Sequence, residues 1–246
     1  MEKTRRPVSF LASVTNESEA RLCASLGADI IDAKNPAAGA LGALPPERIS
    51  AIRACVPARI PVSATIGDPS EDAEHVASAA RLAAATGVDI VKIGFWPGAA
   101  HERTARRLGK LALPPVRLVA VLLVDRGLEL GLIGPLRDAG FSGVMLDTED
   151  KGRGALPELV PATILEAFVD AASAAGLFAG FAGSLRLEHV PYLLTFAPGV
   201  LGFRGGLCQG RARTAGIDAA AVRAVRRACG SPLRDAIAPL QSERAL

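Results

Sequence analysis

The chain alternates short apolar runs with longer stretches of helical character from one end to the other. This alternation restricts the fold more than any other feature, because near-continuous apolar strands separated by helices are typical of a parallel sheet covered by helices. Eight runs are predicted strands: Ser9–Val14, Asp29–Ala33, Pro61–Ile66, Ile90–Ile93, Leu118–Val124, Gly143–Leu146, Phe178–Ala182 and Val200–Phe203.

The segments that follow these strands are predicted helices. Several end at a glycine just before the next strand, as helix C-termini often do, and Asn16 with Glu19 three residues later resembles a capping box. The predicted helices are Glu17–Ser25, Pro46–Cys55, Asp72–Thr86, His101–Lys110, Leu128–Ala139, Pro161–Ala175, Glu188–Leu194 and Asp218–Ala228.

Eight strand–helix units in 246 residues predict an α/β protein with a (β/α)8 TIM barrel, formed by one domain over residues 1–246. A doubly wound open sheet is the alternative fold. No linker or low-complexity segment divides the chain. The tail Ser231–Leu246 is expected to add a short helix or to fray.

Charge and composition argue against several classes of partner. A net charge of +3, one Trp and one Tyr provide neither the basic surface nor the aromatic side chains that nucleic-acid binding uses. No apolar run approaches the ~18 residues of a membrane span. The four cysteines have no Cys-x-x-Cys spacing and are expected to be free thiols in a reducing cytoplasm.

No metal and no organic cofactor is expected. His, Asp and Glu residues lack the spacing of metal ligands, and Gly202–Gly206 does not match the dinucleotide-binding fingerprint.

Lysines and aspartates stand where several predicted strands end. Lys34 and Lys92 lie in apolar runs, where an unpaired charge is costly. Asp32 and Lys34 are two residues apart, so an extended strand directs both to the same side. Asp147 ends the sixth strand and Lys151 follows it. Because barrel enzymes have their active sites at these strand ends, the five residues are candidate catalytic groups.

An amine among other cations and low-dielectric walls loses its proton more easily and can attack a carbonyl to form a Schiff base. The alternative is structural: each lysine could extend to solvent or belong to an ion pair. The turns after the seventh and eighth strands contain Gly183, Ser184, Arg204, Gly205 and Gly206, which predict a phosphate site, although glycine-rich turns also serve helix entry.

Several of these segments resemble the (5-formylfuran-3-yl)methyl phosphate synthase family. The resemblance covers nearly the whole chain, and its most specific block is Asp32-Ala33-Lys34-Asn35-Pro36. Other matching segments are Ser13–Asn16 with Glu19, Gly39–Gly42, Val62–Asp68, Val91–Gly94, Gly143–Thr148 and Arg204–Cys208.

This resemblance implies a (β/α)8 barrel without metal or organic cofactor that condenses glyceraldehyde 3-phosphate to a phosphorylated furan aldehyde. The product is a precursor of methanofuran-type cofactors of one-carbon metabolism. Lys34 resembles the Schiff-base lysine, and Asp32, Lys92, Asp147 and Lys151 resemble the other charged residues of the site.

The expected reaction is a lyase-type aldol condensation and dehydration. An imine of Lys34 with the keto form of one triose phosphate gives a carbanion equivalent that attacks the aldehyde of a second triose, while Asp32 or Lys92 moves protons. The alternatives are a class I aldolase acting on another sugar phosphate and a non-catalytic barrel that binds a phosphorylated metabolite. The sequence does not determine the oligomeric state, and a homo-oligomer stays open.

Overall fold

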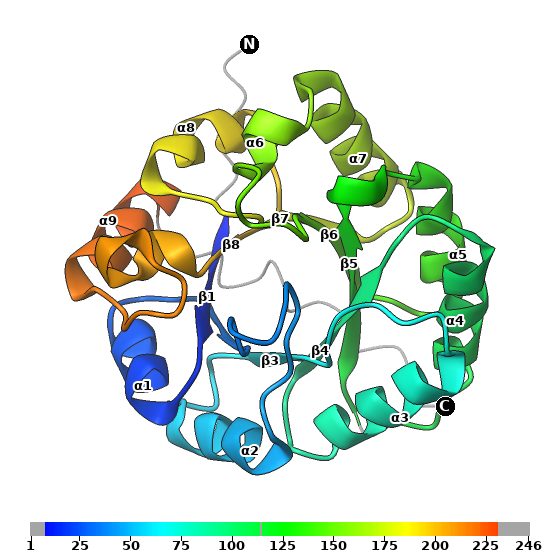
Figure 1. The fold of residues 1–246 in the computed structure, drawn as a ribbon, viewed down its shortest axis with the longest axis horizontal. Coiled ribbons are helices and arrows are strands. Elements are labelled where there is room, and N and C mark those ends of the chain that lie inside the picture. Colours follow the sequence, from blue (N-terminus) through cyan, green and yellow to red (C-terminus); the bar gives the residue numbers. More distant parts are fainter. Residues whose placement is uncertain (1–7, 114, 231–246) are drawn as a thin grey trace.

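The computed structural model describes residues 8–113 and 115–230, in which eight parallel strands close into a barrel in the order of the sequence. Helices surround this barrel on the outside (Figure 1). The closed sheet confirms the (β/α)8 barrel and excludes the doubly wound alternative. The strands are β1 Ser9–Val14, β2 Ile30–Ala33, β3 Val62–Thr65, β4 Ile90–Phe95, β5 Arg117–Leu123, β6 Gly143–Asp147, β7 Phe178–Phe181 and β8 Val200–Phe203.

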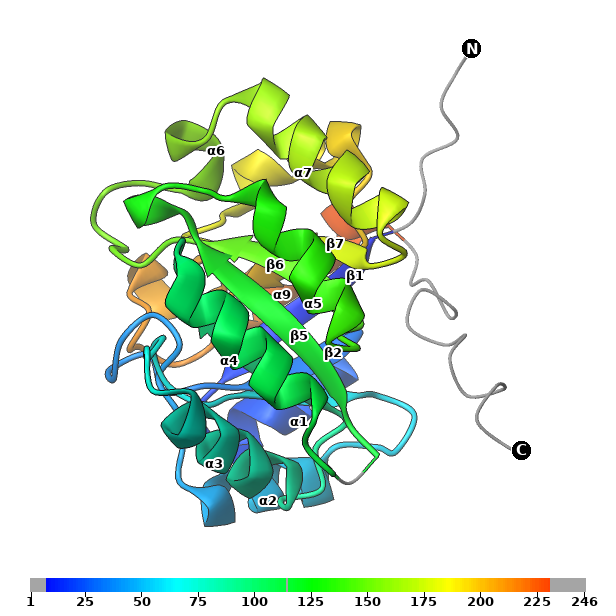
Figure 2. The ribbon, with the colours of Figure 1, turned by 90° about the vertical axis from the view of Figure 1, so that its right-hand side faces the viewer.

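The helices alternate with the strands along the chain. They are α1 Glu17–Ser25, α2 Pro46–Cys55, α3 Ala73–Ala84, α4 Ala99–Gly109, α5 Ile133–Asp138, α6 Leu156–Leu159, α7 Ala162–Ala174, α8 Val190–Leu193 and α9 Ala219–Cys229. These helices pack on the outside of the barrel, where α4 and α5 flank β5 (Figure 2). The N-cap prediction for α1 is confirmed, because the Asn16 side chain accepts a hydrogen bond from the Glu19 N–H at 3.0 Å. The tail at residues 231–246 lies outside the described residues.

Two predicted helices are shorter than expected. The helix predicted over Leu128–Ala139 begins only at Ile133, after a 3₁₀ turn at Leu130–Leu132. Glycines disfavour a continuous helix here, and Gly127 adopts a positive φ of 98°. The segment Glu188–Leu194 likewise contains only the four helical residues of α8, flanked by 3₁₀ turns. The short helix α6 was not predicted.

The inside of the barrel is built in layers, as the period of two in a strand requires. The lower layer is an apolar cluster of buried side chains: Leu11, Ile30, Ile90, Val119, Met145 and Val200. Two residues further along four of these strands, the side chains become polar: Ser13, Asp32, Lys92 and Asp147. The apolar layer therefore forms the floor beneath a buried polar layer at the carboxyl ends of the strands.

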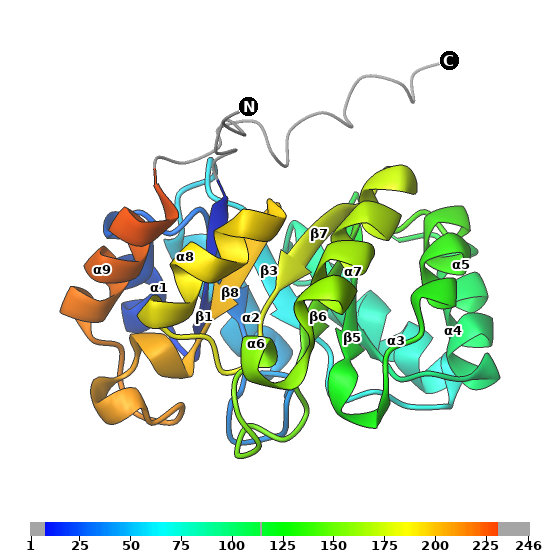
Figure 3. The same ribbon diagram turned by 90° about the horizontal axis from the view of Figure 1, so that it is seen from above.

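Long loops follow β2, β6 and β8 at this same end of the barrel (Figure 3). The loop after β2 turns inward, and its residues Ala40 and Leu41 are buried against Val121 and Leu123 of β5. A Cβ atom on Gly94 of β4 would lie 2.6 Å from the Leu41 side chain, so only glycine permits this close approach. The loop thereby covers the β4–β5 side of the barrel mouth and leaves the opposite side open.

Candidate active site

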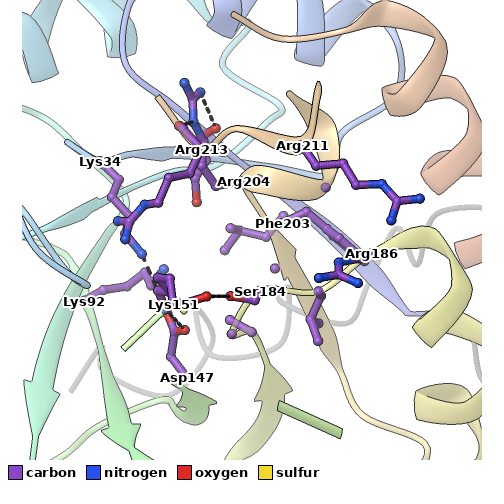
Figure 4. Close-up of a pocket in the computed structure, with 18 residues that line it drawn as sticks. Lys34, Lys92, Asp147, Lys151, Ser184, Arg186, Phe203, Arg204, Arg211 and Arg213 are labelled. Atoms are coloured by element: carbon purple, nitrogen blue, oxygen red, sulfur yellow. Dashed lines mark hydrogen bonds and ion pairs between the residues drawn. The ribbon is translucent and has the colours of Figure 1, made fainter. Parts of the chain in front are cut away.

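A cavity of about 260 Å³ opens at the carboxyl ends of the strands. Lys34, Lys92, Asp147 and Lys151 line it together with residues of the turns after β7 and β8 (Figure 4). Four of the five predicted catalytic residues therefore lie in the cavity wall, and the fifth, Asp32, lies directly behind Lys92.

Asp32 is fully buried and holds three neighbours. Its carboxylate accepts hydrogen bonds from Ser13 Oγ at 2.8 Å, Ser63 Oγ at 2.6 Å and Lys92 Nζ at 3.1 Å. Burial alone would raise the pKa of Asp32, but the positive charges of Lys92 and Lys34 and the two hydroxyls lower it. Asp32 is therefore an ionised carboxylate that holds the Lys92 side chain at the cavity wall.

Asp147 lies between two lysines. Its Oδ2 is 3.7 Å from Lys34 Nζ, and its Oδ1 accepts hydrogen bonds from Lys151 Nζ and from the Thr148 N–H. Burial opposes its charge, yet Lys151 and Lys34 lower the pKa of Asp147 to about 2. The carboxylate is thus ionised at neutral pH and positions both lysines.

Lys34 is a buried lysine with a lowered pKa. Its side chain is 7% exposed. Burial lowers its pKa to about 8, with Lys151 and Lys92 acting in the same direction and Asp147 in the opposite one. Much more of this amine than of an ordinary lysine is therefore uncharged at neutral pH, and the uncharged amine is the nucleophilic form.

The predicted phosphate residues line the same cavity. Gly183 and Ser184 both have positive φ, 98° and 50°, and within the described residues their N–H groups donate to no protein acceptor. A Cβ on Gly206 would lie 2.4 Å from the Leu185 carbonyl oxygen, so the two turns pack backbone to backbone. Free N–H groups in such turns suit an anion.

Arg204 has a different environment from the one its position suggested. Its guanidinium pairs with Glu19 of α1 at 2.6 Å and donates to three backbone carbonyls, those of Ser13, Arg213 and Ala215. These contacts engage the guanidinium within the protein. Arg204 lines the cavity, but its side chain connects the β8 turn to β1 and α1.

Arg213 is a cavity residue that the sequence did not reveal. It lies in the irregular loop after β8, where no periodic pattern indicates which side chains point inward. Asp125 and Arg126, after β5, lie outside the cavity wall. Asp125 accepts from the Glu149 and Asp150 N–H groups, and Arg126 stacks 3.7 Å from the Trp96 ring centroid, so both support the neighbouring loops.

The described residues contain no group of three or more His, Cys, Asp or Glu side chains that could hold a metal ion. Across residues 8–113 and 115–230, no helix is long and apolar enough to cross a membrane. The side chains that line the cavity supply amines, a carboxylate, hydroxyls and guanidinium groups.

Comparison with known proteins shows which family this chain resembles. Residues 10–226 match the family model described as 4-HFC-P synthase. A Methanocaldococcus jannaschii (5-formylfuran-3-yl)methyl phosphate synthase is 36% identical over 234 residues, covering 89% of this chain and 99% of that protein. A Methylorubrum extorquens protein that bears the same activity name provisionally is 41% identical over 230 residues, covering 92% and 94%.

Two solved structures support the fold. Phosphoribosyl anthranilate isomerase from Thermus thermophilus has a TM-score of 0.63 at 17% identity, covering 89% of this chain and 96% of that one. A 3-hexulose-6-phosphate synthase has a TM-score of 0.61 at 19% identity, covering 90% and 99%.

Proposed function

This chain belongs to the 4-HFC-P synthase family, and on that premise we propose that it condenses two molecules of glyceraldehyde 3-phosphate to (5-formylfuran-3-yl)methyl phosphate. The observation that carries the proposal is the buried Lys34 amine, whose pKa is lowered to about 8 beside Asp147 and Lys151 in the barrel mouth. An amine of this kind is suited to form an imine with a triose phosphate carbonyl.

The carbon skeleton of the product determines which bond must form. The ring carbon that bears the phosphomethyl group is bonded to three carbons, so it is the central carbon of one triose. Its new neighbour is a terminal carbon of the other triose. Attack on an aldehyde carbon, expected from the sequence, would join two terminal carbons and give an unbranched chain. The electrophile is therefore the central carbonyl of the keto triose, dihydroxyacetone phosphate. This ketose forms from one glyceraldehyde 3-phosphate by isomerisation, in which the C2 proton leaves and C1 gains a proton.

We assign the imine of Lys34 to this keto carbon. The second triose loses its C2 proton and then its phosphate, which breaks a carbon–oxygen bond and leaves an enol with a nucleophilic CH2 carbon. This carbon attacks the Lys34 iminium. Closure of the ring through the hydroxymethyl group, loss of water and release of the amine give the furan. Two trioses yield the product, one phosphate and two waters, without an oxidant or a reductant.

The remaining charged residues receive separate roles in this proposal. Asp147 stays ionised because its pKa is about 2, and it holds Lys34 and Lys151 in place. Asp32 lies behind the wall and holds Lys92. We therefore assign the proton transfers near the reacting carbons to Lys92 and Lys151. The phosphate that remains on the product binds the free N–H groups of the turns after β7 and β8.

The proposal extends to the cellular setting. The product would supply the furan unit of a methanofuran-type cofactor in one-carbon metabolism, and the enzyme would work in the cytoplasm on free triose phosphates. All four cysteines are free, which suits a reducing compartment. Homo-oligomerisation stays a prediction from the sequence.

Borohydride reduction in the presence of dihydroxyacetone phosphate tests the imine. We expect a covalent adduct on Lys34, located by peptide mass spectrometry, and none in Lys34→Arg. Lys110→Arg, at the exposed end of α4, is the matched control and should be labelled on Lys34 as in the wild type. An adduct on Lys92 or Lys151, or no adduct, would show that the imine assignment is wrong.

A further inference from the structure

Seven cationic side chains line the cavity, and six of them have a carboxylate partner within 4.0 Å. The paired residues are Lys34, Lys92, Lys151, Arg186, Arg204 and Arg211. Arg213 is the seventh, and within residues 8–113 and 115–230 it forms no ion pair of this kind. No carboxylate among the described residues therefore lies within ion-pair distance of Arg213 to offset its charge.

The hydrogen bonding of Arg213 supports the same conclusion. One guanidinium N–H, on Nη2, donates to the Gly39 carbonyl oxygen at 2.8 Å. Among the described residues its other guanidinium N–H groups have no protein acceptor. A guanidinium held by one bond, with a planar set of donors left over, matches the geometry of a phosphate group.

Partial burial opposes the charge of Arg213 and lowers its pKa, whereas Asp147 and Asp68 act in the opposite direction. An arginine nevertheless stays protonated at neutral pH. Because the charge of Asp147 acts on the pKa of Arg213, the guanidinium also lies near the lysines that Asp147 holds.

Arg213 and the glycine-rich turns occupy different parts of the cavity wall. Arg213 reaches the segment that follows Lys34, whereas Ser184 Oγ donates to the Lys151 carbonyl oxygen at 3.4 Å on the loop after β6 (Figure 4). The cavity therefore offers two separate places for an anion: free N–H groups at Gly183 and Ser184, and the guanidinium at Arg213.

We propose that Arg213 binds the second phosphate of the reaction, the one that leaves, an inference that rests on the proposed condensation. After a base removes the C2 proton of the aldose, the electron pair moves to form the C2–C3 double bond. The C3–O bond breaks, and its electrons go to the departing phosphate. Arg213 stabilises the charge that develops on that phosphate oxygen, and the enol remains to attack the iminium at Lys34.

Arg213→Ala and Arg213→Lys test this role by separating elimination from imine formation. We expect Arg213→Ala to lower the release of inorganic phosphate from glyceraldehyde 3-phosphate by about a hundredfold, as removal of one charge-stabilising donor does. The borohydride adduct of dihydroxyacetone phosphate on Lys34 should form as in the wild type. Arg213→Lys should recover part of the rate, because it keeps the charge and loses the planar donors. Arg106→Ala, on the exposed face of α4, is the control and should behave as wild type.

Equilibrium dialysis with labelled inorganic phosphate gives a second readout that does not require turnover. We expect two bound phosphates per chain in the wild type and one in Arg213→Ala. The same number of bound phosphates in both proteins would overturn the assignment. Loss of imine trapping together with phosphate release in Arg213→Ala would also overturn it and would show that Arg213 has a structural role. Failure of the wild type to make the furan would instead contradict the proposed condensation, while the dialysis result would still decide whether Arg213 binds phosphate.

Discussion

At the scale of single residues, the site depends on which buried charges are paired. Asp32 and Lys34 were predicted to share a strand face; in the structure Lys34 lines the cavity, and Asp32 is fully buried and bonded to Lys92. The sequence could not show that Asp32 would be enclosed by Ser13 and Ser63, because these hydroxyls come from two other strands. Strand-end positions predicted the charged cluster, whereas the partner of each charge depends on the register between strands.

The lowered pKa of Lys34 predicts a specific pH dependence. Imine formation requires the neutral amine, so the rate of adduct formation with dihydroxyacetone phosphate should rise with pH and level off above about 8. A lysine with the usual pKa of 10.5 would give a rate that continues to rise beyond pH 9. Reductive trapping from pH 6 to pH 10 measures this profile.

Lys151→Met provides a check on the cause of this shift. Removal of the neighbouring positive charge should move the midpoint of the profile to higher pH, because Lys151 contributes to lowering the pKa of Lys34. Lys110→Met, remote from the cavity, should leave the midpoint unchanged. A wild-type midpoint near 10 would contradict the described environment of Lys34.

At the scale of elements, α1 and the β8 turn are joined by a buried ion pair. Glu19 accepts from the Thr15 N–H at 2.8 Å and from two nitrogens of Arg204, which also donates to the Ser13 carbonyl at the end of β1. The helix cap at Asn16 was visible in the sequence, since its residues are local. The contact between Glu19 and Arg204 joins residues 185 positions apart, and no local pattern could indicate it.

Glu19→Gln should destabilise the protein by about 3 kcal/mol or more, because it leaves the Arg204 guanidinium buried without a counter-charge. Glu17→Gln lies in the same helical turn and removes an exposed pair with Arg48, so it should cost about 1 kcal/mol or less. Urea unfolding of both variants gives the comparison. Equal losses in the two variants would mean that the Glu19–Arg204 pair does not stabilise the junction of β8 with α1.

At the scale of the whole molecule, the alternation of strands and helices was sufficient to predict the barrel, because eight strand–helix units in a chain of this length are typical of a (β/α)8 barrel. The irregular segments were not predictable in the same way. The loop after β2 buries Leu41 over Gly94, and the loop after β8 brings Arg213 to the cavity, yet neither segment has a periodic pattern. These loops confine the cavity to one side of the barrel mouth, and the loop after β8 supplies Arg213, which has no ion-pair partner among the residues that the structure describes.

Incubation of the wild-type protein with glyceraldehyde 3-phosphate alone tests the central claim most directly. Mass spectrometry of the product, ultraviolet absorption of the furan aldehyde and a phosphate assay are measured together, with Lys34→Arg as the inactive control. The proposed reaction predicts one furan phosphate and one inorganic phosphate for every two trioses consumed. A hexose bisphosphate that retains both phosphates, or no consumption of the triose, would contradict it.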